Sequence, residues 1–304
     1  MFTVKQLRYF QTLANIGHFG EASDKLGISQ PALSAQIAEM EKMAGSALFE
    51  RTAKRIILTP LGLSFLPYVN DILGRMSALG DIIASHKVPL SHPLKLGIIP
   101  TVAPYLLPSL LPRIRYLYPS LSLQIKESKT DRVVELLRSG SLDTIVAASP
   151  IDEDEFVCEP LFDDNFYYAV PRDDPNALYK SVKEGSVDTG KLLLLEEGHC
   201  LRDQTLEACH TKQYRHDITA SSLTTLIQLV ANGIGMTIVP QLAVSTEART
   251  DNISVIAFDG EIPKRRICLF WRRRSRRSKD FKLLAELLKS VAQPILDQAK
   301  NYIG

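Results

Sequence analysis

The sequence predicts a mixed α/β protein with a helical N-terminal domain, a linker helix and a two-lobed α/β domain. Three observations lead to this fold class. Apolar residues in 1–60 have the spacing of short helices, and residues 60–87 continue that spacing as one longer helix. From Leu94 onward, short apolar strands alternate with helical segments. A chain of 304 residues is also too long for one ordinary core, so we expect two or three domains.

The composition is that of a folded soluble protein, with 45% hydrophobic and 23% charged residues. The net charge is only +2, so any binding of nucleic acid must depend on a local arrangement of basic side chains. The N-terminal segment lacks a basic stretch followed by an apolar run, and no apolar stretch approaches the roughly 20 residues that span a bilayer. We therefore expect a cytoplasmic protein with no membrane partner, whose thiols are normally kept reduced.

A helix-turn-helix is predicted near the N-terminus. A first helix in "VKQLRYFQTLANIG" precedes a short helix that Gly27 ends, and "ISQPALSAQIAEMEKMAG" follows as a third helix. Ser29 is suited to cap this third helix, and Pro31 lies in its first turn, where its missing N–H costs little. A helix, a tight turn and a second helix in about 25 residues are typical of this motif.

A basic hairpin, or wing, is predicted after these helices. Arg51, Lys54 and Arg55 lie around an expected turn, and "RIILT" has the pattern of a strand. These elements complete a winged helix-turn-helix domain over residues 1–59. A helix-turn-helix can also be a helical pair that does not bind DNA, but the basic wing favours DNA binding.

A linker helix is expected over residues 60–90. Apolar side chains seven residues apart form a heptad seam, in which one series contains Leu66 and Leu73 and the other contains Val69 and Met76. Such a seam is suited to dimerisation, although it could equally be ordinary core packing. Pro67 lies inside the helix and should kink it or delay its regular start.

Residues 91–304 are predicted to form two α/β lobes. The strands "LKLGIIPT", "LSLQIKES" and "LDTIVAAS" alternate with helical segments, which is typical of a parallel sheet with right-handed crossovers. A second set of strands and helices follows, and "RRICLFW" with the last helix returns to the first lobe. We place lobe I at about 91–163 and 268–304, and lobe II at about 164–267.

Two of the four cysteines lie in "GHCLRDQTLEACH", residues 198–210. They could be core filler, a metal site, a catalytic nucleophile or a redox switch. A zinc site would use Cys200, Cys209, His199 and His210, but this spacing resembles no common zinc-binding pattern. The other two cysteines, Cys158 and Cys268, lie in apolar strands and are interpreted as inert small hydrophobes. The run "RRRSRR" at 272–277 is interpreted as a solvated loop.

Residues 19–51, "FGEASDKLGISQPALSAQIAEMEKMAGSALFER", resemble the winged helix-turn-helix of LysR-type transcriptional regulators. The linker helix and the two lobes also fit that family, so the resemblance covers essentially the whole chain. It implies a periplasmic-binding-protein-like fold for the regulatory domain. The segments "GIIPTVAPYLLP", "PLFDDNFYYAV" and "GHCLRDQTLEAC" resemble the peroxide-sensing members of the family. The loop after Cys209 is a couple of residues shorter than in those members.

The position of the two thiols suggests how they differ. Cys200 stands at the predicted start of a helix, where the helix dipole and unpaired N–H groups favour a thiolate. Cys209 lies near the helix end, so Cys200 is expected to attack peroxide and Cys209 to resolve the sulfenic acid. Nine helical residues span roughly 13 Å, whereas a disulfide needs Cα atoms within about 7 Å. Oxidation would therefore have to unwind the helix.

The resemblance implies a peroxide-sensing regulator that is not an enzyme, needs no cofactor or metal, and switches through a reversible Cys200–Cys209 disulfide. The partners that it implies are promoter DNA, hydrogen peroxide, RNA polymerase and a thiol reductant such as glutaredoxin. It also implies that the chain assembles as a dimer of dimers. The residues that it implies for the peroxide pocket are Thr101, Thr130, His199 and Asp203, to which we add Arg272 after "ICLFW".

The residues expected to contact DNA fall into two groups. Those in the first turns of the recognition helix face base edges; they are Ser29, Gln30, Pro31 and Ser34. The wing residues Arg51, Lys54 and Arg55 are better placed for phosphate or the minor groove.

Two other functions remain open from the sequence. One is a LysR-type regulator whose cleft binds a small organic inducer, with the cysteines incidental. The other is an enzyme, a thiol peroxidase on a two-lobed scaffold, although the N-terminal domain would then lack a purpose. Steady turnover with a thiol reductant would favour the enzyme.

Overall fold

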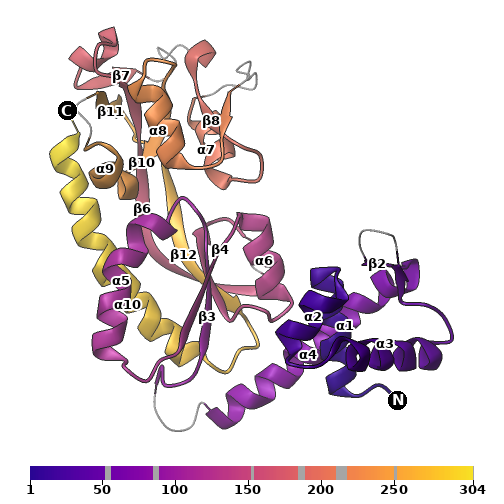
Figure 1. The fold of residues 1–304 in the computed structure, drawn as a ribbon. Helices are drawn as coiled ribbons and strands as arrows, with labels where there is room; N and C mark the ends of the chain where they lie inside the picture. Colours follow the sequence, from indigo (N-terminus) through magenta and orange to yellow (C-terminus); the bar gives the residue numbers. More distant parts are fainter. Residues whose placement is uncertain are drawn as a thin grey trace. The chain divides into compact units, whose positions relative to one another are not determined.

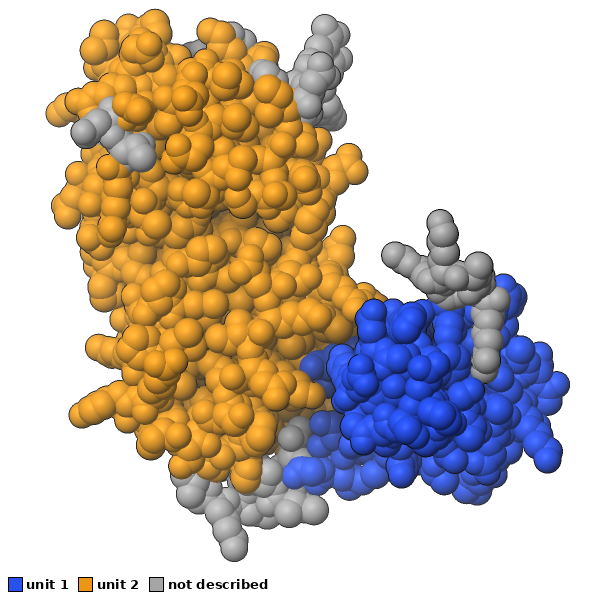
Figure 2. Space-filling view, viewed as in Figure 1, with its two compact units in different colours: residues 1–86, 139–141 blue, residues 87–138, 142–304 orange. Residues whose placement is uncertain are grey.

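The computed structural model divides the chain into two compact units, one of residues 1–86 with 139–141 and the other of residues 87–138 with 142–304 (Figure 2). The residues that the structure describes are 1–51, 56–84, 89–151, 154–183, 189–209, 218–249 and 252–303. Lys54, Arg55 and His210, which the sequence singled out, lie outside these residues.

The first unit contains the predicted helices and wing. Its elements are α1 (Val4–Ile16), α2 (Phe19–Leu26), α3 (Gln30–Ala44), β1 (Phe49–Arg51), β2 (Ile56–Leu58) and α4 (Pro60–Ala84). β1 and β2 pair antiparallel, as the wing requires. The Ser29 side chain accepts a hydrogen bond from the Ala32 N–H at 3.4 Å, which confirms it as the N-cap of α3. Gly27 and Gly45 end α2 and α3 in the left-handed conformation.

The linker helix α4 is one continuous helix that begins at Pro60, so Pro67 does not delay its start. The predicted heptad seam is divided between two environments. Leu66, Val69 and Leu73 pack against the core of the first unit. Among the described side chains of α4, the exposed apolar ones are Leu61, Leu63, Tyr68, Ile72, Met76 and Leu79, so Met76 of the predicted seam is exposed.

The second unit is built on one sheet in the strand order β4-β3-β5-β12-β6-β11-β7, with β10 also paired to β6 (Figure 1). The strands are β3 (Leu94–Ile98), β4 (Leu123–Glu127), β5 (Thr144–Ala148), β6 (Phe156–Pro171), β7 (Ser181–Lys183), β10 (Thr237–Pro240), β11 (Ile253–Asp259) and β12 (Lys264–Arg272). β3 pairs parallel with β4 and β5, as predicted. β12 runs antiparallel to β5 and β6.

The long strand β6 connects the two parts of this sheet. Its first half pairs with β12, and its second half pairs with β10 and β11. β6 and β12 both cross the lobe boundaries predicted at residues 163 and 268. The lobes therefore share strands, and a residue near the middle of β6 or β12 can contact elements of both.

Helices cover the sheet, and several of the candidate site residues lie at or near the start of one of them. They are α5 (Ala103–Leu117), α6 (Thr130–Arg138), α7 (Cys200–Ala208), α8 (Leu223–Ala231), α9 (Gln241–Glu247) and α10 (Ser278–Ala299). Shorter elements complete the unit, namely η1 (Pro175–Leu178), η2 (Thr189–Lys191), β8 (Leu194–Leu195), β9 (Thr219–Ala220) and η3 (Lys300–Tyr302). In the described part of the chain, no helix has both the length and the apolar character that a membrane span requires.

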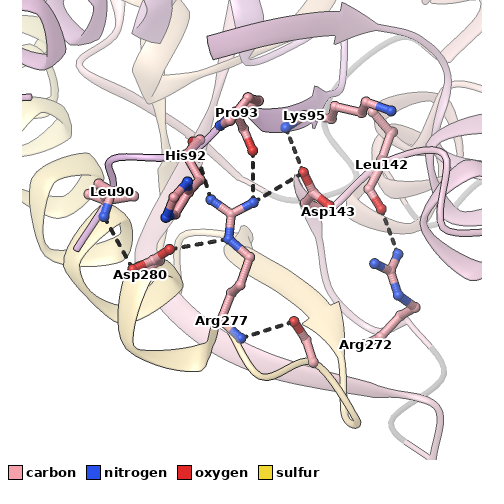
Figure 3. Close-up of polar contacts among 10 residues, drawn as sticks. Leu90, His92, Pro93, Lys95, Leu142, Asp143, Arg272, Arg277 and Asp280 are labelled. Atoms are coloured by element: carbon pink, nitrogen blue, oxygen red, sulfur yellow. Dashed lines mark hydrogen bonds and ion pairs between the residues drawn. The ribbon is translucent and has the colours of Figure 1, made fainter. Parts of the chain in front are cut away.

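A buried arginine joins the start of α10 to the segment that leads into β3 (Figure 3). The Arg277 side chain, 3% exposed, forms ion pairs with Asp280 at 3.1 Å and Asp143 at 3.6 Å. It also donates to the main-chain oxygen of Pro93 at 2.8 Å. Asp280 accepts the Leu90 N–H at 3.2 Å. The run at 272–277 is thus only partly the solvated loop expected from the sequence, because Arg277 is structural.

Candidate redox and DNA-binding sites

The candidate redox site is organised by α7, which begins at Cys200 as predicted. The preceding residue, His199, occupies the N-cap position but its side chain makes no capping hydrogen bond. The half-buried Cys200 thiol therefore lies beside a first turn whose N–H groups have no side-chain cap.

The turn before α7 requires a glycine and contacts the start of α6. Gly198 has φ of 85°, in the left-handed region. A Cβ at this position would lie 3.2 Å from Lys129 Cδ. Lys129 Nζ in turn donates to the Glu197 carbonyl at 2.7 Å and is 3.5 Å from a Glu196 carboxylate oxygen. These contacts bring the segment that contains Thr130 against the loop that contains His199.

His199 is 4% exposed, and its buried Nε2 atom has no hydrogen-bond partner. Burial lowers the pKa of His199, and the positive charge of Lys129 lowers it further. The negative charge of Glu196 raises the pKa, but by less than the other two lower it. The imidazole is therefore neutral at pH 7. The Thr130 hydroxyl and the Gln204 side-chain oxygen are also buried without a partner. Buried polar atoms are nearly always paired, so each of these three atoms has the capacity for a further hydrogen bond.

Cys209 is the C-cap residue of α7 and is 5% exposed. All four cysteines are reduced in this structure. Cys200 and Cys209 are nine residues apart on this helix, which corresponds to about 13 Å along its axis. Because a disulfide needs Cα atoms within about 7 Å, the two thiols cannot join while α7 stays helical.

Thr101 lies three residues after the end of β3 and is held by an arginine that the sequence analysis missed. Arg265 Nη1 donates to the Thr101 hydroxyl at 2.8 Å, and Nη2 donates to the Thr101 carbonyl at 3.1 Å. Arg265 also contacts one Asp164 carboxylate oxygen through Nε at 3.0 Å and through Nη2 at 2.9 Å. The Thr101 hydroxyl accepts from Arg265 and still has its own proton to donate.

The structure places Arg272, which the sequence analysis added to the pocket, away from Thr101. Arg272 lies at the opposite end of β12, where its guanidinium donates to the Leu142 carbonyl (Figure 3) and to the Leu137 carbonyl. It is seven positions along the strand from Arg265, a distance of about 23 Å. One signal could have identified Arg265. The acidic pair Asp163–Asp164 in "PLFDDNFYYAV" matches the basic pair Arg265–Arg266 across two antiparallel strands.

Asp203 lies in the first turn of α7 and is exposed. Its role in the pocket stays a prediction. Two adjoining cavities of about 390 and 370 Å³ lie between α7 and the start of β12. Gln204, Glu207 and Lys264 line both cavities, and Arg265 lines the second. The sequence analysis also missed Gln204, because nothing in the local pattern distinguishes it from other polar residues of an amphipathic helix.

Comparison with known proteins identifies the family. Residues 4–63 match the model of the bacterial regulatory helix-turn-helix proteins of the lysR family, and residues 88–293 match the LysR substrate binding domain. The chain belongs to the LysR family. It is therefore a DNA-binding transcriptional regulator and not an enzyme.

Several LysR-family relatives are similar over almost their whole length. A probable hydrogen peroxide-inducible genes activator of Mycobacterium avium is 37% identical over 94% of this chain and 93% of its own. The DNA-binding transcriptional dual regulator OxyR of Escherichia coli K12 is 34% identical over 94% of this chain and 95% of its own.

Two solved structures of OxyR superpose on this LysR-family chain. One is a full-length Pseudomonas aeruginosa OxyR in which a cysteine is replaced by aspartate. It has a TM-score of 0.80 and 34% identity, and the match covers 97% of both chains. The other is a Corynebacterium glutamicum OxyR variant, with a cysteine replaced by serine and H₂O₂ bound. It has a TM-score of 0.69 and 34% identity over 98% of this chain and 95% of its own.

The residues predicted to face base edges of DNA lie at the N-terminus of α3 in this LysR-family protein. Ser29, Gln30 and Pro31 are exposed there, and Ser34 is half-buried one turn further on. Leu33 and Ile37, on the opposite face, are buried. The exposed polar face is thus fixed by the core beneath it. Arg51 ends β1, but the rest of the predicted wing contacts fall on Lys54 and Arg55, outside the described residues.

Proposed function

We propose that this LysR-family regulator senses hydrogen peroxide through Cys200 and resolves the oxidised sulfur with Cys209. One observation carries the proposal. Cys200 is the first residue of α7, next to His199, whose buried and neutral imidazole has an unpartnered Nε2. The peroxide-related names of the relatives, and the H₂O₂ bound to one of the OxyR structures, support the same ligand.

In the first step, the Cys200 thiolate attacks one oxygen of the peroxide. A sulfur–oxygen bond forms, the O–O bond breaks, and hydroxide leaves and takes up a proton. We assign Thr101, Thr130 and His199 to hold the peroxide, because a molecule that both donates and accepts hydrogen bonds would pair their buried polar atoms. Arg265 replaces Arg272 in this set, and its positive charge would stabilise the departing hydroxide. Asp203 is retained as a proposed pocket residue.

In the second step, the Cys209 thiol condenses with the Cys200 sulfenic acid to give a disulfide and water. The helix must unwind for the sulfurs to meet, and the side chains of Leu201 and Ala208 must leave the core that they now occupy. This loss of packing would convert one chemical event into a change of fold in the regulatory domain.

The partners of the regulator are proposed on the same basis. The first turn of α3 would read promoter DNA. The exposed apolar side chains of α4 would form a dimer contact, and two dimers would assemble into a homotetramer. RNA polymerase and a thiol reductant such as glutaredoxin would complete the cycle. The proposed domain boundaries lie between residues 59 and 60 and between residues 90 and 91.

Peptide mass mapping tests the switch directly. The full-length protein is alkylated before and after treatment with one equivalent of peroxide, then digested. We expect a linked Cys200–Cys209 peptide that forms with peroxide and disappears with a dithiol. A Cys209→Ser variant should instead accumulate sulfenic acid at Cys200, which dimedone traps. If both thiols are still alkylated after excess peroxide, the proposed sensor is wrong.

A second function is favoured by the two adjoining cavities beside α7. Their volumes, about 390 and 370 Å³, are in the range of small-molecule sites. In this alternative the regulator binds a small organic inducer there and the cysteines are incidental. A library of small acids and amides that raises the melting temperature of the protein, with the thiols unreactive to peroxide, would support it.

A further inference from the structure

A second pair of cysteines lies in the middle of the sheet. Cys158 belongs to β6 and Cys268 to the neighbouring strand β12. In the register of these strands, Cys268 is opposite Pro160, and Cys158 is opposite Phe270. Because side chains alternate between the two faces of a strand, both thiols lie on one face, as diagonal neighbours. The two side chains are therefore neighbours on that face of the sheet.

The pair connects the protein interior with solvent. Cys268 is 0% exposed, whereas Cys158 is half-buried and lines an open cavity of about 440 Å³. Ser149 and Arg266 line the same cavity. The Arg266 guanidinium, which is ion-paired with Asp163 at 3.0 Å, lies close enough to both sulfurs to interact with them electrostatically. The pair thus has an entry path and a nearby positive charge.

Distance distinguishes a metal ion from a disulfide. Diagonal neighbours on adjacent antiparallel strands have Cα atoms about 7–8 Å apart, at or beyond the limit of about 7 Å for a disulfide without backbone movement. Two metal–sulfur bonds of about 2.3 Å, the length in zinc thiolates, would place the sulfurs about 4.6 Å apart across one ion. Neighbouring side chains on one face of the two strands can take up this separation.

We propose that Cys158 and Cys268 form a second thiol site that binds one soft univalent metal ion, such as Cu(I), in two-coordinate geometry. Soft thiolate ligands select ions of this class. Binding replaces both thiol protons and forms two metal–sulfur bonds, with no change in oxidation state. The resulting bis-thiolate complex carries a net charge of −1, which Arg266 compensates. The inference does not rest on the proposed peroxide chemistry of Cys200 and Cys209.

The test uses full-length protein with Cys200→Ser and Cys209→Ser, so that the other thiols cannot bind the ion. Cu(I) is titrated anaerobically against a chromophoric Cu(I) chelator. We expect one tightly bound Cu(I) per chain, with two sulfur ligands by X-ray absorption. Adding Cys158→Ser should weaken Cu(I) binding by more than about 100-fold. Loss of an outer-shell partner lowers metal affinity by about 10–100-fold, and loss of a ligand should lower it more. Binding no tighter than in a variant without cysteines would overturn the proposal.

Two further measurements keep the test decisive if Cys158→Ser does not fold. Bound Cu(I) should protect Cys158 from alkylation in the protein with Cys200→Ser and Cys209→Ser, and an unchanged alkylation rate would contradict the site. Arg266→Gln should weaken Cu(I) binding by about 10–100-fold and leave Hg(II) binding unchanged, because the Hg(II) bis-thiolate is neutral. Arg266→Lys should restore Cu(I) binding. Equal losses for both ions would overturn the assignment of a univalent ion.

Discussion

Arg265 and Asp164 form an ion pair whose two side chains are both completely buried, and the same guanidinium holds Thr101. The pair lies where β6 and β12 run side by side, between the two parts of the sheet. Asp164 also accepts the Leu242 N–H at 2.9 Å, which connects it to the start of α9. One arginine therefore links three elements and orients a hydroxyl that we assign to the peroxide pocket.

Replacing Asp164 by asparagine should destabilise the protein strongly. The change leaves the Arg265 charge buried without a counter-charge, which costs about 3–5 kcal/mol. The neighbouring Asp163→Asn provides the control, because Asp163 pairs with exposed Lys264 and Arg266 side chains. Loss of such surface pairs costs about 0–1 kcal/mol. Urea unfolding of both variants measures the difference, and similar losses for the two would contradict this account.

Stability should fall below neutral pH because of His199. Burial and Lys129 hold the folded-state pKa of His199 below its ordinary value of 6.5. The unfolded chain therefore binds the proton more readily, and the contribution is fully present above pH 6.5. It is lost as pH falls from there through the folded-state pKa. The free energies of unfolding of wild type and His199→Gln, measured between pH 5 and 8, should become more similar as the pH falls. A constant difference across this range would contradict the contribution of His199.

Oxidation of Cys200 should depend on the Thr101 hydroxyl. Thr101→Val keeps the shape of the side chain but removes the group that Arg265 orients, so the reaction with peroxide should slow by at least about tenfold. Thr101→Ser keeps the hydroxyl and should react at nearly the wild-type rate. The rate is followed as the loss of alkylatable Cys200 after mixing with peroxide. Equal rates in the two variants would remove Thr101 from the pocket.

Recognition of DNA should divide between the helix and the wing. Gln30→Ala removes a base-edge contact, so it should change sequence preference by about 1–3 kcal/mol at one base pair. Lys54→Ala should weaken binding to all sequences alike and reduce its salt dependence. Affinities for a set of single-base promoter variants at several salt concentrations separate these effects. A sequence-dependent loss in Lys54→Ala would contradict the phosphate assignment.

Local features were predicted well because short-range chemistry determines them. Ser29 caps α3 and Cys200 begins α7, and both follow from N-terminal preferences visible in the sequence. Short apolar segments likewise predicted the strands β3, β4, β5 and β12 of the sheet. The family resemblance extended these local predictions to a complete architecture, which the comparisons confirmed.

Features that depend on register were missed. Arg265 and Arg272 are equally basic in the sequence, and only the pairing of β12 with β6 decides which one contacts Asp164 and Thr101. The division of the heptad seam in α4 was missed for a related reason. Leu66, Val69 and Leu73 pack against the core of their own unit, whereas Met76 is exposed together with other apolar side chains of α4. The metal-binding geometry of Cys158 and Cys268 also emerges only across two strands.

The contacts of Arg277 and Asp280 have a practical consequence for hybrid regulators. Both side chains hold the segment that leads into β3 through its main chain, at Leu90 and Pro93. These contacts therefore depend on the path of the backbone more than on which side chains these residues carry. A chimera that joins this regulatory domain to a foreign DNA-binding domain should place the junction before Leu90. A junction inside the clamped segment would leave Arg277 buried beside two carboxylates with its main-chain acceptors displaced.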